Sequence, residues 1–91
     1  MQRGVLSITK EEFTQLLKVL NIGIFKDTQL YEKLFSATQS NEQEIRILLS
    51  EDEIEKIIDE VGPPIYDDQL VNSAIQKINN LLVTLRPQPA I

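Results

Sequence analysis

The sequence predicts a mainly α-helical fold, a single-domain four-helix globule with a pseudo-symmetric plan of two β-α-α units whose short strands could pair. Three observations predict it. The 91 residues leave room for only one hydrophobic core. The stretch SITKEEFTQLLKVL at 7–20 is followed 41 positions later by the similar stretch LLSEDEIEKIIDEV at 48–61. Both stretches carry apolar residues at helical spacing.

The first unit, about residues 4–41, opens with a short apolar run at 5–8 that is typical of a strand. Four residues then have the spacing of a capping box enclosed by a hydrophobic staple, which together start a helix. They are Ile8, Thr9, Glu12 and Phe13. The apolar stripe of this helix is Phe13, Leu16, Leu17 and Leu20. We expect about eleven residues, ending near Asn21 and Gly23.

The second unit, about residues 45–86, repeats these features. A second strand is expected at 45–49, where bulky apolar residues alternate with other residues. The second box and staple consist of Leu49, Ser50, Glu53 and Ile54, and the stripe of Ile54, Ile57, Ile58 and Val61. This helix is expected to end at Gly62, because Pro63 and Pro64 cannot continue it. The likeness of the units fits either an internal duplication or the coincidence of two common helix starts.

Each unit is expected to close with a further helix, since the segments beginning at Asp27 (DTQLYEKLF) and Asp67 (DDQLVNSAI) are alike at an offset of 40. The last helix is predicted to run to about Leu85 and to form the centre of the core. Its apolar stripe is Leu70, Val71, Ala74, Ile75, Ile78, Leu81, Leu82 and Leu85. Residues 87–91 contain two prolines and are expected to form an extended tail.

Composition narrows the range of functions. The chain contains no cysteine, histidine or tryptophan, so thiol nucleophiles, imidazole bases and the commonest zinc ligands are excluded. No glycine-rich phosphate loop or nucleophile elbow occurs. We therefore expect no enzyme, and we identify no catalytic, cofactor-binding or metal-ligating residue. No apolar run is long enough for a signal peptide or a membrane helix, which favours the cytoplasm.

Charge is concentrated in one region. Residues 42–68 contain ten acids and two bases, a net charge of −8, within a chain whose net charge is −5. This field repels nucleic acid unless the bases of the first 41 residues converge on one face. Those bases are Arg3, Lys10, Lys18, Lys26 and Lys33.

Two resemblances bear on function. The strand-and-capped-helix plan resembles the layout of paired EF-hands, which implies divalent-metal binding. The segment 37–53, ATQSNEQEIRILLSEDE, has neither the aspartate series nor the glycine of an EF-hand loop. Ser7, Ile8, Phe13, Gln15, Leu16 and Leu17 look like the opening helix of colicin immunity proteins, small acidic inhibitors of basic nucleases. That family's tyrosine pair followed by proline is absent, so no functional residue is carried over.

The sequence thus predicts a small acidic protein-interaction module, an adaptor or regulator that binds a protein with a basic surface. The residues expected at the contact are Glu51, Asp52, Glu55, Asp59 and Glu60 in the acidic helix and Asn72, Gln76 and Asn79 in the last helix. The alternatives are an immunity-type inhibitor of a basic toxin or nuclease and a divalent-metal binder. A homodimer through the amide-rich last helix is also plausible, since such a face is easily desolvated.

Overall fold

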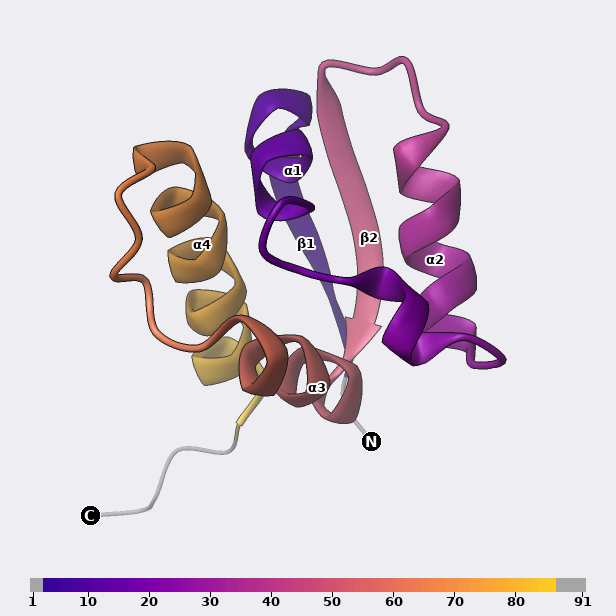
Figure 1. Cartoon of the computed structure of the whole chain (residues 1–91). Helices are drawn as coiled ribbons and strands as arrows, with labels where there is room; N and C mark the ends of the chain where they lie inside the picture. Colours follow the sequence, from indigo (N-terminus) through magenta and orange to yellow (C-terminus); the bar gives the residue numbers. More distant parts are fainter. Residues whose placement is uncertain (1–2, 87–91) are drawn as a thin grey trace, which may run out of the picture.

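The computed structural model describes residues 3–86, and it shows a two-stranded antiparallel sheet and four α-helices (Figure 1). The elements in chain order are β1 (Arg3–Thr9), α1 (Lys10–Leu16), the 3-10 helix η1 (Ile22–Phe25), α2 (Gln29–Thr38), β2 (Glu44–Ser50), α3 (Glu51–Val61) and α4 (Gln69–Leu85). The expected mainly α-helical four-helix globule is therefore wrong. The fold is mixed α and β, because both strands are longer than the apolar runs that predicted them and pair along all seven residues.

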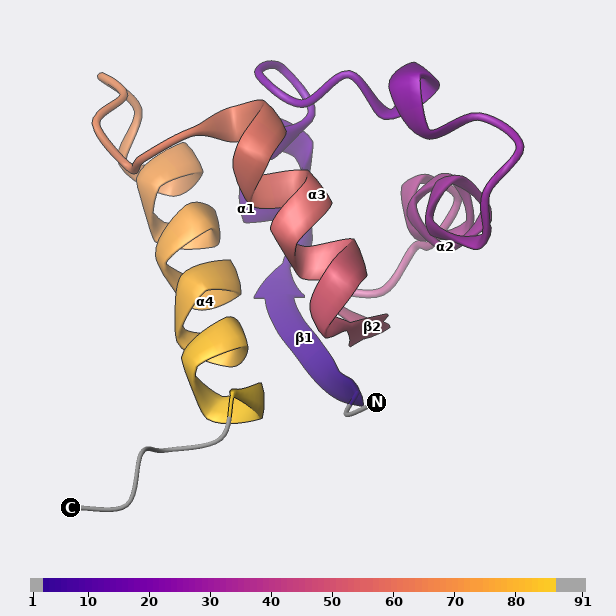
Figure 2. The same cartoon turned by 90° about the horizontal axis from the view of Figure 1, so that it is seen from below.

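The sheet places the core on one face. The register runs from Arg3 opposite Ser50 to Thr9 opposite Glu44. Successive side chains of a strand point to opposite faces, and the buried ones are Leu6, Ile8, Ile45, Ile47 and Leu49. Seen from below, α3 crosses between α4 on one side and α2 on the other (Figure 2). The opposite face of the sheet is left exposed, with Val5 and Leu48 side by side on it.

Both predicted capping boxes are confirmed. The hydroxyl of Thr9 accepts from the Glu12 N–H at 3.0 Å, and the Thr9 N–H donates to the Glu12 carboxylate at 2.8 Å. The corresponding distances for Ser50 and Glu53 are 3.2 and 2.9 Å. Each strand therefore passes directly into a helix, with the first orphan N–H groups satisfied by side chains.

The two capped helices end differently. The helix α3 ends as expected at Gly62, which has a φ of 74°. The helix α1 is shorter than expected and ends at Leu16, because the chain tightens there into a turn. The N–H groups of Lys18 and Val19 donate to the carbonyls three residues before them rather than four. Leu20 nevertheless remains in the core.

The second helices begin slightly later than expected. Thr28 caps α2 and Asp68 caps α4, whereas Asp27 lies before the cap with a φ of 71°. The helix α4 ends at Leu85, as predicted. The predicted tail, residues 87–91, lies outside the described residues.

The last helix of each half packs against the strand of the other half. The helix α4 packs against β1 and α1, whereas α2 packs against β2. Segment 37–53 contains the end of α2, all of β2 and the start of α3, so a full strand occupies the place of an ion-binding loop and the EF-hand-like layout is also wrong. Across residues 3–86, no helix has both the length and the apolar character needed to cross a bilayer.

Candidate functional site

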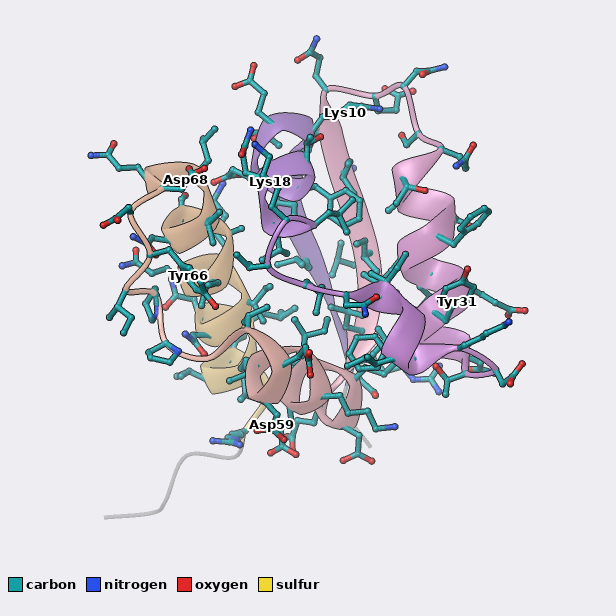
Figure 3. All side chains as sticks on the ribbon, viewed as in Figure 1. Lys10, Lys18, Tyr31, Asp59, Tyr66 and Asp68 are labelled. Atoms are coloured by element: carbon teal, nitrogen blue, oxygen red, sulfur yellow. The ribbon has the colours of Figure 1, made fainter. Side chains whose placement is uncertain are left out.

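The five acidic residues predicted to contact a partner all lie on α3 and form one surface, which we call the α3 ridge. Its members are Glu51, Asp52, Glu55, Asp59 and Glu60. Three of them, Asp52, Asp59 and Glu60, are exposed. The Glu55 carboxylate accepts from Arg86 at 2.6 Å and is partly neutralised. Figure 3 shows Asp59 on the outer side of α3, directed away from the body of the molecule.

The acids from Glu42 to Asp68 do not form one continuous surface. Asp68 lies at the start of α4, well away from Asp59 (Figure 3). Its carboxylate accepts from the Leu70 N–H at 2.9 Å, so it acts as a helix cap. Glu44 lies on β2 and accepts from Ser7 and Arg46, which lowers the pKa of its carboxyl group. The net charge of −8 in the sequence is thus divided among three places in the fold.

The three polar residues predicted on α4 have different surroundings. The Asn72 amide accepts from the Tyr66 N–H at 2.9 Å and donates to the Tyr66 carbonyl at 2.7 Å. The Tyr66 hydroxyl donates in turn to the Val61 carbonyl. Asn72 therefore holds the connection between α3 and α4 in place. Gln76 is exposed and Asn79 half-buried, and their contact with a partner stays a prediction.

A groove that the sequence did not indicate lies between α2 and β2. It has a volume of about 890 Å³ and is lined by residues of α2, of the connection that follows it, and of β2. The lining residues are Gln29, Glu32, Lys33, Ser36, Ala37, Ser40, Glu42 and Glu44 to Leu48. The helix runs antiparallel to the strand, because a short connection joins the end of α2 to the start of β2 (Figure 1).

One wall of the groove is the outer edge of β2. The Lys10 N–H donates to the Gln43 carbonyl at 2.8 Å, which extends the ladder by one hydrogen-bonded pair beyond Thr9 and Glu44. Hydrogen-bonded and non-hydrogen-bonded pairs alternate in an antiparallel ladder. The backbone groups of Ile45 and Ile47 therefore face β1, and those of the residues between them face away. The hydrogen bonds of the described residues 3–86 leave these outward groups unpaired on Glu44, Arg46 and Leu48.

The groove exists because α2 is shorter than α4. The helix α4 has 17 residues and α2 has 10. The last turns of α4 cover the start of β1 so closely that a Cβ atom at Gly4 would lie 2.7 Å from Leu81 and 3.2 Å from Leu85. The counterpart of Gly4, 41 positions later, is Ile45 in the groove wall. No residue of α2 corresponds to these leucines, since α2 ends at Thr38.

The N3 glutamates of the capping boxes also bind the far half of the chain. Glu12 is 4% exposed and accepts from Ser73 at 2.5 Å and from Lys77 at 2.7 Å. Burial acts to raise the pKa of its carboxyl group, but the hydrogen bonds from Lys77, Ser73 and Thr9 outweigh this and lower the pKa from 4.5 to about 2. Glu53 accepts from Lys33 at 2.7 Å, and hydrogen bonding again outweighs burial and lowers the pKa.

The carboxylates of Glu12 and Glu53 are structural groups. Every oxygen of Glu12 has a donor, and within residues 3–86 no buried side-chain oxygen or nitrogen lacks a partner. Their low pKa values keep them ionised at neutral pH, which is unsuitable for a general acid or base. The part of the chain that the structure describes brings no three Asp or Glu residues together as a metal site. The groove is therefore the strongest candidate site.

Comparisons with known proteins add no further information. No family model, no curated protein and no solved structure matches the chain.

Proposed function

We propose that this chain is a protein-interaction module that binds a partner protein by adding one strand of the partner to β2 in the α2–β2 groove. The observation that carries the proposal is the outward backbone edge of Glu44, Arg46 and Leu48 beside a groove of about 890 Å³. Strand addition to an open sheet edge is a recurring mode of peptide recognition, in which backbone hydrogen bonds provide affinity and pockets beside the edge provide specificity.

The groove supplies both elements of this mode. Six outward N–H and C=O groups, two on each of three residues, are positioned to pair with an incoming strand. Side chains of that strand which point inward would meet Ala37 of α2, a small residue that leaves room for them. An unpaired edge is a liability for aggregation, and a partner strand bound in the groove would satisfy it.

The α3 ridge supports a second part of the proposal, the choice of a partner with a basic surface. Its exposed carboxylates and the net charge of −5 would speed the approach of such a partner and discourage acidic ones. None of its members lines the α2–β2 groove, so its contribution is expected in the association rate and in salt dependence.

An immunity-type inhibitor of a basic toxin is the second candidate, and the α3 ridge is the observation that favours it. This function would place the tight contact on Asp52, Asp59 and Glu60 rather than on β2. Binding to such a toxin would weaken strongly with salt and would be lost when these three residues are replaced by their amides. The geometry of residues 3–86 offers no comparable support for the divalent-metal alternative.

The test is selection of binding peptides from a displayed random library, followed by NMR mapping of each selected peptide. Strand addition predicts the largest shifts at the amides of Glu44, Arg46 and Leu48. In Arg46→Pro the outward N–H is removed while the ladder with β1 is kept, so binding is expected to be lost. The matched control is Val5→Pro, which alters the equivalent position on the outer edge of β1.

Two results would refute the proposal. One is a set of selected peptides that shift only the α3 amides, which would favour the inhibitor reading. The other is equal binding to the wild type, Arg46→Pro and Val5→Pro. Amide spectra of the unbound variants establish that both remain folded, and N-methylation of alternate peptide bonds in the ligand tests the same hydrogen bonds without altering the protein.

The proposed compartment remains the cytoplasm, and self-association through α4 stays a prediction.

A further inference from the structure

The geometry points to a specific kind of ligand: an extended segment of about seven residues, with apolar side chains toward α2 and a basic residue at each end. This inference rests on the proposed function and names the partner class for the same groove. The length follows from the groove wall, because the six steps from Glu42 to Leu48 span about 20 Å at about 3.3 Å per residue of strand.

The apolar part of the pattern follows from how the other half of the molecule is built. Over β1, the space beside the strand is filled by Leu81 and Leu85, which contact the position of Gly4. Over β2, the equivalent place belongs to the groove, where Ala37, Ile45 and Ile47, each at most 8% exposed, form an apolar floor. A segment paired with β2 places every second side chain on this inner face. Apolar residues at those positions would supply what the two leucines supply over β1.

The basic residues at the two ends of the ligand are inferred from the groove carboxylates that form no ion pair. Lys33 is neutralised by Glu53 at 2.7 Å, and Arg46 pairs with Glu44 at 3.1 Å. Two lining carboxylates, on Glu32 and Glu42, are exposed and form no ion pair with any of residues 3–86. They lie toward opposite ends of the groove, since Glu32 is in the first half of α2 and Glu42 directly precedes β2. Lysine or arginine at each end of a bound strand would pair with them.

The probe is the blocked peptide acetyl-Lys-Thr-Val-Thr-Val-Thr-Lys-amide, in which the lysines and valines share one face of the strand. It is titrated into the full chain and followed by NMR. The control peptide carries glutamate in place of both lysines. We expect binding of the lysine peptide, with the largest shifts at Glu44, Arg46 and Leu48, and at least about tenfold weaker binding of the glutamate peptide, for which attraction at two ends becomes repulsion.

Protein variants test the same pairs from the other side. Glu32→Gln and Glu42→Gln are each expected to weaken binding of the lysine peptide by about two- to fivefold, the range for an exposed ion pair. Asp52→Asn, which removes a charge from the α3 ridge, is the matched control and should leave the affinity within twofold of wild type. All three positions are exposed, so the fold is expected to persist.

Three outcomes would overturn the inference. If peptides selected from the library add to β2 but carry no basic ends, the inference is wrong and the proposed function stands. If neither these nor the lysine peptide shifts the β2 amides, both are wrong. If the amides of Glu44, Arg46 and Leu48 shift with protein concentration alone, and sedimentation shows a dimer, the occupant is a second copy of this chain.

Discussion

The buried carboxylate of Glu12 gives the sharpest quantitative prediction. Replacing it with glutamine keeps an oxygen that can accept from the Thr9 N–H, but it removes the charge that Lys77 and Ser73 bind at 2.7 and 2.5 Å. At neutral pH Glu12→Gln should therefore lower the free energy of unfolding. The expected loss is about 1 to 3 kcal/mol, the range for a hydrogen-bonded charged group that is removed from a buried site.

The pH dependence follows from the lowered pKa. The folded protein binds the Glu12 proton with a pKa of about 2, against 4.5 when the group is unperturbed. A carboxyl whose pKa is depressed by folding stabilises the native state above its unfolded pKa, and this stabilisation is lost as the pH falls toward the folded pKa. The difference corresponds to about 3 kcal/mol at about 1.4 kcal/mol per pH unit, of which about 2 kcal/mol should be lost by pH 3.

The assay is urea unfolding followed by circular dichroism at several values between pH 6 and pH 3. The stability of wild type and of Glu12→Gln should converge as the pH falls, because the protonated wild-type side chain resembles the amide. The control is Glu11→Gln, a change at the exposed neighbouring glutamate, whose curve should run parallel to that of the wild type. A constant difference between wild type and Glu12→Gln across this range would refute the reasoning.

Three further substitutions test the fold by the same unfolding assay. Gly4→Ala places a Cβ atom 2.7 Å from Leu81 and should cost about 1 kcal/mol, and most of this cost should disappear when Leu81→Ala is the background; additive losses would contradict the contact. Gly62→Ala should cost about 1 to 3 kcal/mol from backbone strain alone, since its φ is 74° and open space surrounds it; an unchanged stability would mean that the chain ends α3 in another way. Asn72→Ala should cost about 1 to 3 kcal/mol by leaving the Tyr66 backbone without its two partners, whereas a residue used only for partner binding would show no loss.

Local signals in the sequence predicted the helix starts well. The capping boxes at Thr9 and Ser50 depend on residues three positions apart, so they are readable without tertiary structure. The end of α3 was equally readable, because only glycine tolerates the backbone of residue 62. The end of α1 was not, because the turn after Leu16 is tightened by packing of Leu20 into a core contributed by the whole chain.

The candidate site was much less predictable than the helix starts. The acids of the α3 ridge lie within eleven residues of one helix, so their grouping follows from the sequence. The groove does not, since it depends on α2 lying beside β2 and stopping short of the space that α4 fills over β1. Two features of the sequence bear on the groove: the alternation of bulky apolar residues with other residues along β2 and the early end of α2. Neither feature showed that these two elements lie side by side.

By itself, the sequence determined where two of the four helices are capped, where α3 and α4 end, and which face of α3 is acidic, because each of these depends on neighbours within a few positions. Tertiary structure decided that the strands pair over seven residues, which changes the fold class from mainly α to mixed α and β. It also decided that Glu12 binds Ser73 and Lys77, 61 and 65 positions away, and that Asn72 serves the fold. Such contacts form between segments that are far apart in the chain. Local propensities describe neighbouring residues only, so they do not predict which distant segments meet.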